Sequence, residues 1–199
     1  MIETRTNFPY LGNRDYVHGT SVLIGMLEAF ENQGVGAIRI RRLKFHRASR
    51  ANGVIMLARD ADAPFSAETA NCTISADVDG ARWHGAFIEQ DVPVSQRVTV
   101  DYRIANMQGA NFSATCDIEP GDRDELIRAI IEANKRSHEL SIEPQAGAPQ
   151  VRFGYLEDWM VPRRNIQFSG RLEVHNLIAQ KTRAGFRTIN RITYTPGSG

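Results

Sequence analysis

Cysteine is scarce in this sequence. The two cysteines, Cys72 and Cys116, are far apart and do not form a Cys-x-x-Cys pair. Their spacing excludes a zinc ribbon and a thioredoxin-like redox motif, both of which need closely paired cysteines. The five histidines are scattered without the spacing of metal ligands. We therefore expect no metal site and no cofactor, and we interpret Cys116 as a small buried apolar side chain.

Long apolar runs and concentrated charge are also missing. No apolar run approaches the roughly 18 residues that a membrane-spanning helix needs, and the N-terminus lacks the charged and apolar segments of a signal peptide. The formal net charge is +1 and the sequence pI is about 7.9, so the chain lacks the broad basic footprint of nucleic-acid-binding proteins. We expect a cytoplasmic protein with no membrane span and no nucleic-acid partner.

The bulk composition is that of a globular protein. The 199 residues are 42% hydrophobic and 24% charged, and a chain of this length can bury a large core without disulfides or metals. Length alone allows one sizeable domain or two small ones.

The stretch over residues 7–33 organises the rest of the sequence. Its second part, from His18 or Thr20 to residue 33, carries apolar residues at helical spacing, and TSVLIGML has no charge. This pattern predicts a helix that is covered on several sides. Gly25 within it costs about 1 kcal/mol of helix propensity relative to Ala, which predicts close approach of a sheet or another helix. If a reactive centre exists, we expect it where this helix begins.

Strand patterns fill most of the remaining chain. The pair Asp79-Gly80 is a strong hairpin signal, and a change of face between Ile40 and Leu43 predicts a bulge. A second helix is predicted from about 121 to 138, with acidic residues in its first turn that suit the helix dipole. A loop follows over 142–149, and the last two strands join at a turn over 183–185. The predicted strands cover 37–46, 54–58, 72–78, 82–88, 97–105, 111–118, 151–160, 165–174, 175–180 and 186–194.

A helix followed by four strands thus occurs twice, with an offset of about one hundred residues. We interpret this order as an internal structural repeat. Residues 1–93 form the first repeat and residues 94–199 the second, within one compact unit.

Several segments carry a resemblance to a known family. They are the apolar helix GTSVLIGMLEAF, the strand pair IRRLKFHRASRANGVIMLA, the hairpin ISADVDGARWHGAF, and the later run VRFGYLEDWMVPRRNIQFSGRLEV with FRTINRITYT. Together they resemble the hot-dog fold, and in particular 3-hydroxyacyl-thioester dehydratases of the FabA/FabZ type. The resemblance implies an α+β double hot-dog, in which antiparallel sheet wraps each of two central helices.

The same resemblance implies acyl-thioester chemistry, as in fatty acid or polyketide metabolism. Backbone N–H groups at a helix start would hold the thioester carbonyl. His18 would act as the base of a dehydratase-like lyase and Asp124 as the partner acid, with Asp122 and Glu125 as rivals. The implied partner is an acyl carrier protein or a coenzyme A thioester, and the chain would be a monomer or homodimer.

Two other functions stay open. The segment YVHGTSVL resembles the HGG segment of hot-dog thioesterases, which would make Glu28 the acidic residue that activates water. The third possibility is a non-catalytic protein that binds an acyl chain or its carrier. The residues expected to bind substrate are Arg14, Tyr16, Gly19 and Thr20.

Each of these residues also has a purely structural interpretation. His18 can bond backbone carbonyls, Glu28 can be solvent-facing charge, and an acid at the position of Asp124 is what a helix start prefers. A basic cluster has two interpretations as well: a solvated strand face, which we favour, or a landing site for a phosphate-bearing carrier. Its members are Arg39, Arg41, Arg42, Lys44, Arg47 and Arg50.

Overall fold

The computed structural model forms two compact units. The first unit contains Met1–Val100 and Gly154–Pro162, and the second contains Asp101–Phe153 and Arg163–Gly199. Neither described helix is long and apolar enough to cross a membrane, as the sequence led us to expect. The residues that the structure describes are 1–34, 36–59, 65–141, 154–164, 166–182 and 185–197.

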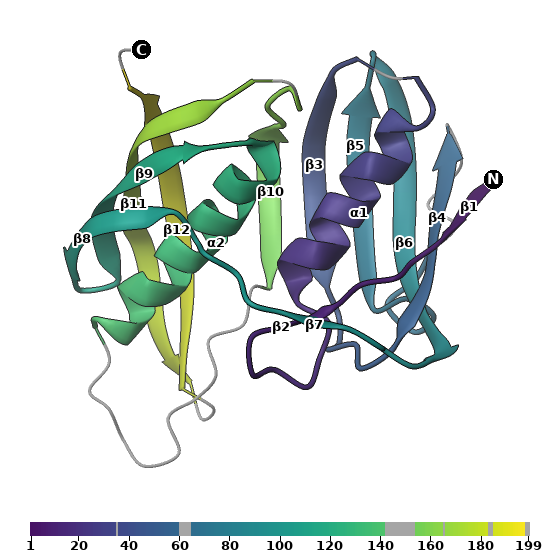
Figure 1. Ribbon diagram of the computed structural model, residues 1–199, viewed down its shortest axis with the longest axis horizontal. Coiled ribbons are helices and arrows are strands. Elements are labelled where there is room, and N and C mark those ends of the chain that lie inside the picture. The colour runs from purple at the N-terminus through teal and green to yellow at the C-terminus, as the bar shows by residue number, and fades with distance from the viewer. Residues whose placement is uncertain (35, 60–64, 142–153, 165, 183–184, 198–199) are drawn as a thin grey trace. The chain divides into compact units, whose positions relative to one another are not determined.

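The first unit packs one helix against a six-stranded antiparallel sheet (Figure 1). The helix α1 (Gly19–Glu31) confirms the helix predicted from the apolar pattern. The sheet has the order β1-β4-β6-β5-β3-β10, and a parallel pair of short strands, β2 (Tyr10–Leu11) and β7 (Arg97–Val98), lies apart from it. The strands of the sheet are β1 (Ile2–Arg5), β3 (Ile38–Phe45), β4 (Asn52–Arg59), β5 (Cys72–Val78), β6 (Ala81–Val92) and β10 (Tyr155–Met160).

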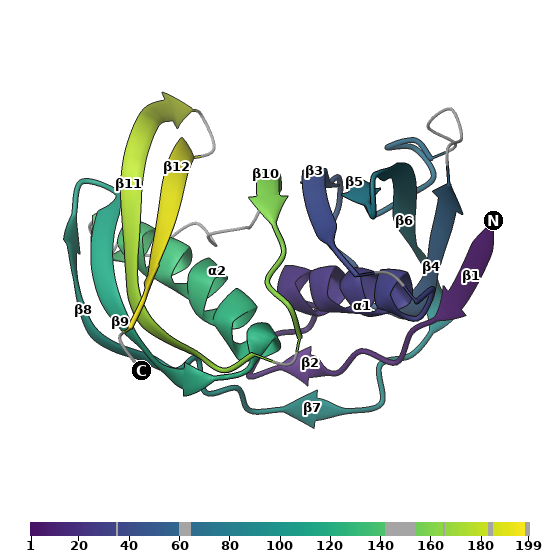
Figure 2. The same cartoon turned by 90° about the horizontal axis from the view of Figure 1, so that it is seen from above.

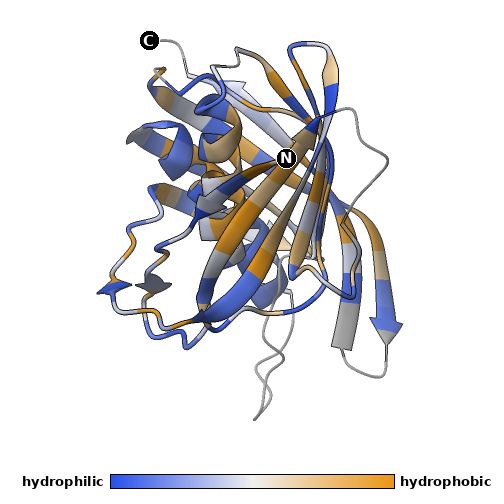
Figure 3. Cartoon of the chain, turned by 90° about the vertical axis from the view of Figure 1, so that its right-hand side faces the viewer, coloured by the Kyte–Doolittle hydropathy of each residue, from blue (hydrophilic) through white to orange (hydrophobic). Residues whose placement is uncertain are grey.

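The core of the first unit lies between α1 and one face of this sheet. Figure 3, in which apolar residues are orange, shows orange stretches along the strands near the N-terminus. The Trp83 ring meets Phe30 of α1 edge-on at 6.0 Å between centroids. A Cβ at Gly25 would lie 2.7 Å from the Phe8 ring and 3.2 Å from Ile55. The predicted close approach at Gly25 is therefore confirmed.

Two local predictions in this sheet are also confirmed. Asp79 and Gly80 both have positive φ, at 47° and 82°, and they link β5 to β6 as a tight hairpin. The pairing of β3 with β5 shifts register between Ile40 and Arg42, which is the predicted bulge.

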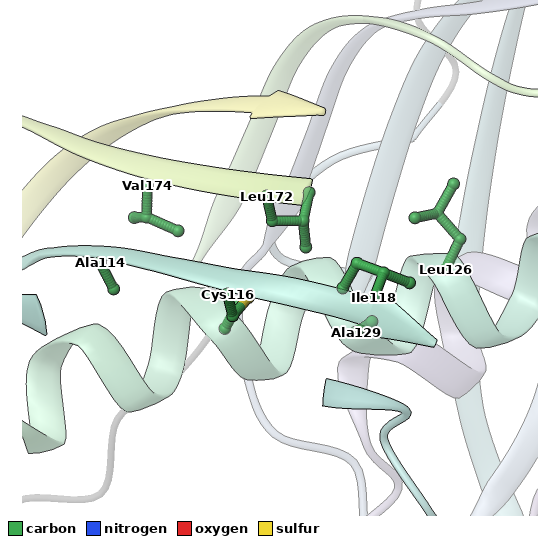
Figure 4. Packing of buried hydrophobic residues seen from close by; sticks show 8 residues of the cluster. Ala114, Cys116, Ile118, Leu126, Ala129, Leu172 and Val174 are labelled. Carbon is green, nitrogen blue, oxygen red and sulfur yellow. The ribbon is translucent and has the colours of Figure 1, made fainter. Parts of the chain in front are cut away.

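The second unit packs α2 (Arg123–Glu139) against a four-stranded sheet of order β12-β11-β9-β8 (Figure 2). Its strands are β8 (Ile104–Ala110), β9 (Ser113–Gly121), β11 (Phe168–Thr182) and β12 (Gly185–Pro196). Figure 4 shows small and branched side chains of the helix and two strands meeting in one cluster. Cys116 belongs to this cluster, which confirms its predicted apolar role. The buried members are Ala114, Cys116, Ile118, Leu126, Ala129, Ala133, Leu172 and Val174.

The predicted double hot-dog fold is wrong. The structure is mostly β, with 53% of the described residues in strands and 17% in helices, and its sheets are unequal. Two of the four strands in the second sheet precede α2, and β10, expected in the second repeat, pairs with β3 of the first unit. Helix and strand patterns are local, whereas the choice of a strand's partner depends on distant parts of the chain. The internal repeat was inferred from the order of the elements alone. The pairing of β10 with β3 shows that this inference is wrong.

The division of the chain also differs from the expected one. The sequence analysis placed the boundary after residue 93, whereas the first unit runs to Val100 and takes in Gly154–Pro162. The predicted loop over 142–149 lies outside the described residues, as do residues 183–184 of the predicted turn.

Candidate functional site

The start of α1 leaves two backbone donors open. His18 is the N-cap residue, with extended backbone angles and no side-chain capping bond. The N–H groups of Ser21 and Val22 donate to the His18 carbonyl oxygen at 2.9 and 3.3 Å. Among the described contacts, the N–H groups of Gly19 and Thr20 have no acceptor. Backbone donors left open at a helix start are suited to an anionic or carbonyl oxygen.

The start of α2 is built differently. The Asp122 carboxylate accepts a hydrogen bond from the Glu125 N–H at 2.9 Å, and the Glu125 carboxylate accepts one from the Asp122 N–H at 2.8 Å. This reciprocal pair is a complete capping box, and Asp124 adds a further acid in the first turn. The first turn of α1 contains no acidic residue. The positive end of the α1 dipole is therefore not offset by a carboxylate of its own first turn.

The His18 side chain lies at this open helix start. It is 9% exposed, and its Nδ1 is 2.6 Å from the hydroxyl oxygen of Thr20, which is fully buried. The Tyr16 ring stacks on the imidazole, with centroids 6.4 Å apart and an angle of 30° between the planes. When Nδ1–H donates to the Thr20 hydroxyl, Nε2 is the basic nitrogen, which is the tautomer that a general base requires. Thr20 therefore orients the ring, and its hydroxyl is compatible with this tautomer because it can accept a hydrogen bond.

The loop before the helix is held from both sides. A backbone bridge joins Val17 to Ser49, and the guanidinium of Arg97 donates to the Arg14 carbonyl oxygen at 2.7 Å. At Gly19 a Cβ would lie 3.2 Å from the Phe45 ring, so a larger residue would crowd β3.

Four of the predicted site residues meet at the start of α1. These are Tyr16, His18, Gly19 and Thr20, and Arg14 lies in the loop just before them. Glu28 lies on the same helix, ten residues after His18. Ten residues of helix span about 15 Å, too far for both side chains to act on one atom.

Asp124 lies in the second unit, at the start of α2. Its carboxylate is 3.2 Å from the guanidinium of Arg123, so it has a structural partner there in addition to its place in the acidic first turn. The pairing of Asp124 with His18 stays a prediction.

Neither cysteine has the properties of a nucleophile. Both thiols are buried. Burial raises the pKa of Cys116 to about 11, and burial also raises the pKa of Cys72. A buried thiol with a raised pKa is not the thiolate that attacks a carbonyl. Within the described residues, no group of three His, Cys, Asp or Glu side chains could hold a metal ion.

Two side-chain groups were not predicted from the sequence. One is a pocket of about 210 Å³ on the first sheet, lined in part by Arg42, Ser75 and His84. The other is a buried polar group in the second unit. There, Nδ1 of His138 is 2.7 Å from the Asn134 carbonyl oxygen, and its Nε2 is 2.5 Å from the Thr188 hydroxyl. Each group joins residues that are distant in sequence, and no local pattern signals them.

The second of these groups has a structural role. A carbonyl oxygen only accepts, so Nδ1 of His138 carries a proton, and the hydroxyl of Thr188 can donate to Nε2. The amide of Asn190 donates to the Asn134 side chain at 2.7 Å and accepts from Asn176 at 2.8 Å. These hydrogen bonds give the His138 ring and the amides of this group their partners and so offset the cost of burying them.

Comparisons with known proteins did not identify a family for this chain. No family model matches the chain, and neither curated proteins nor solved structures gave a match. The resemblance stated from the sequence is thus without support from relatives, and function has to be argued from the site itself.

Proposed function

We propose that this protein binds an acyl thioester at the start of α1 and acts on it there. The observation that carries the proposal is the contrast between the two helix starts. The N–H groups at the start of α2 are bonded by the helix's own carboxylates, whereas at the start of α1 the partly exposed N–H group of Gly19 lies next to His18. A thioester carbonyl oxygen accepting from the Gly19 N–H would be held by that hydrogen bond and by the helix dipole, because Gly19 is partly exposed whereas Thr20 is fully buried.

The reaction that suits this arrangement is the removal of water from a 3-hydroxyacyl thioester. His18 takes the proton from the carbon next to the carbonyl, and the electron pair moves onto the carbonyl oxygen as an enolate. The Gly19 N–H group and the positive end of the helix dipole stabilise this negative charge. As the enolate collapses, the carbon–carbon double bond forms, and the hydroxyl group leaves as water after taking a proton from an acid.

The resemblance implied Asp124 as the source of that proton, but Asp124 belongs to the second unit, so this assignment stays a prediction from the sequence and is not part of the proposed site. Hydrolysis of the thioester by His18 and Glu28 is less well supported, because the helix separates the two by about 15 Å. Dehydration is therefore the first activity to assay, and hydrolysis and simple binding are alternatives that the same assay distinguishes.

The experiment incubates the full chain with 3-hydroxyacyl and enoyl thioesters of coenzyme A and of pantetheine. We expect reversible loss and addition of water without release of thiol. His18→Gln should lower the rate by roughly 10²–10⁴-fold, the usual contribution of a general base. The matched control is His175→Gln, at an exposed histidine of the second unit, which should leave the rate unchanged.

The other outcomes are equally distinct. Release of thiol would show that the protein is a thioester hydrolase and not a lyase. Saturable binding without turnover would show that the protein binds the thioester but does not act on it. A His18→Gln variant with the full rate would remove His18 from the mechanism, and the absence of both binding and turnover would overturn the proposal.

A further inference from the structure

The face of the first sheet that points away from α1 carries a second group of polar side chains. Successive residues of a strand point to opposite faces. Trp83 packs on Phe30 of α1, so its neighbour His84 points away from the helix. The strand register places Arg42 opposite Ser75 and Ser75 opposite His84. One row across β3, β5 and β6 therefore offers a guanidinium, a hydroxyl and an imidazole.

The adjoining row on the same face extends this group. Lys44 lies opposite Thr73, and Thr73 lies opposite Ala86. The Thr73 hydroxyl is 2.9 Å from Nε2 of His46, which fixes its position. Thr73 lines the open part of this face beside the first row, whereas Ala86 is fully buried.

These two rows border a pocket of about 210 Å³, with Phe65 as an apolar wall. We call it the outer-face pocket; it is lined by Arg42, Phe65, Thr73, Ile74, Ser75, His84 and Gly85. Pockets for drug-sized ligands and cofactors hold roughly 300–1,000 Å³. The outer-face pocket is smaller, so it suits a compact ligand.

Among the described ion pairs of the β3 arginines, that of Arg42 is the longest. The guanidinium of Arg39 lies 2.6 Å from the Asp158 carboxylate, and Arg41 makes a close ion pair with Asp77. Arg42 instead lies 3.4 Å from Glu157, and its side chain is 62% exposed. A loose, exposed ion pair of this kind contributes little to stability. Arg42 can therefore turn from Glu157 to an anion in the pocket at small cost.

We propose that the outer-face pocket binds a phosphate group, either inorganic phosphate or the phosphate of a small monoester. The guanidinium fork of Arg42 matches two phosphate oxygens. The Ser75 hydroxyl and the His84 ring can donate to the others, and Lys44 adds positive charge nearby. A carboxylate has two oxygens and would use fewer of these donors. This site is distinct from the one at the start of α1. The proposal that it binds phosphate does not depend on the proposed thioester chemistry.

The experiment titrates the full chain with inorganic phosphate, phenyl phosphate and acetate by calorimetry at constant ionic strength. We expect saturable binding of phosphate or its monoester, with acetate at least tenfold weaker. Tighter binding of phenyl phosphate than of inorganic phosphate would identify a monoester as the ligand, with the phenyl ring against Phe65. The reverse order would identify free phosphate.

Variants assign the binding to the pocket. Arg42→Gln should weaken it about tenfold or more, the effect of losing a charged hydrogen bond, and Ser75→Ala should weaken it less. Glu157→Gln should tighten it by releasing Arg42. The matched control is Arg39→Gln, on the same strand but outside the pocket, which should bind as the wild type does. Circular dichroism of each variant confirms that it is folded.

Three results would overturn the proposal. They are the absence of saturable binding in the millimolar range, equal affinity for acetate and phosphate, and unchanged affinity in a folded Arg42→Gln variant. Each leaves the thioester proposal untouched, because that proposal is tested by turnover at His18.

Discussion

Nδ1 of His18 and the hydroxyl oxygen of Thr20 lie 2.6 Å apart across the first turn of α1. The N-cap imidazole is thus held by a residue of the helix that it precedes. Because Thr20 is fully buried, the bond sits where water competes for it least. It links the helix start that would hold a thioester to the side chain that would act on it.

The first prediction tests Thr20 as a positioning residue. Thr20→Val keeps the shape of the side chain and removes the hydroxyl, so the His18 ring loses the partner that orients it. We expect the turnover number to fall about tenfold. This is the effect of losing roughly one hydrogen bond, here the one that orients the His18 ring. Thr20→Ser restores the hydroxyl and should recover most of the rate. A folded Thr20→Val variant with the full rate would show that the bond does not matter for turnover.

A second prediction concerns the contact between Gly25 and Phe8. A side chain at Gly25 would enter space that the Phe8 ring occupies. Gly25→Val should lower the free energy of unfolding by about 1–3 kcal/mol, as overpacking does, measured by urea denaturation.

The Phe8→Ala variant tests whether the Phe8 ring is the cause of this loss of stability. In the double variant the valine has room, so its cost should be smaller than in the wild-type background, and the two changes should not add. Strictly additive effects would mean that Phe8 is not the neighbour that excludes a side chain at Gly25.

A third prediction concerns the buried His138 of the second unit. Thr188→Val removes the hydroxyl that lies 2.5 Å from its Nε2 and leaves a buried nitrogen without that partner. We expect a loss of about 1–3 kcal/mol in the free energy of unfolding. Thr188→Ser keeps the hydroxyl and should lie close to the wild type. Equal stability of the valine and serine variants would exclude a contribution from this hydrogen bond.

A fourth prediction follows from the hairpin acid Asp79. Its carboxylate accepts hydrogen bonds from the N–H groups of Ala37 and Gly36, both at 2.8 Å, which lower its pKa. Its folded pKa is thus below the unfolded value of about 3.9. The stability that Asp79 adds is therefore fully present above about pH 4 and is lost as the pH falls through the folded pKa.

Thermal unfolding of the wild type and Asp79→Asn measures this effect. Asn tolerates the positive φ of this position and does not titrate. The wild type should melt higher near neutral pH, and the difference should shrink below about pH 4. A difference that stays constant down to low pH would show that the charge of Asp79 is not what stabilises the hairpin.

The sequence predicted best what is decided locally. The spacing of apolar residues gave α1, the pair Asp79-Gly80 gave the hairpin between β5 and β6, and the change of face after Ile40 gave the bulge. In each case the deciding residues are neighbours in the chain. The four residues that meet at the start of α1 were also found in this way, because a helix start gathers residues that are consecutive in sequence.

Partners that are distant in sequence were not predicted. β10 follows α2 in the chain but pairs with β3, and that choice depends on which sheet edge is accessible after folding. This one pairing is enough to overturn the repeat and the double hot-dog fold. The outer-face pocket needs Arg42, Ser75 and His84 on three neighbouring strands, so the strand register has to be known before it can be seen.

The central claim is that the open start of α1 receives the thioester carbonyl. The most direct measurement follows backbone amide chemical shifts of the labelled protein while an acyl-pantetheine amide analogue is added, which cannot lose its acyl group by thioester cleavage. We expect saturable shifts at Gly19 and Thr20, with none at Arg123 and Asp124 at the closed start of α2. Saturable shifts that leave the Gly19 and Thr20 amides unmoved would contradict the account.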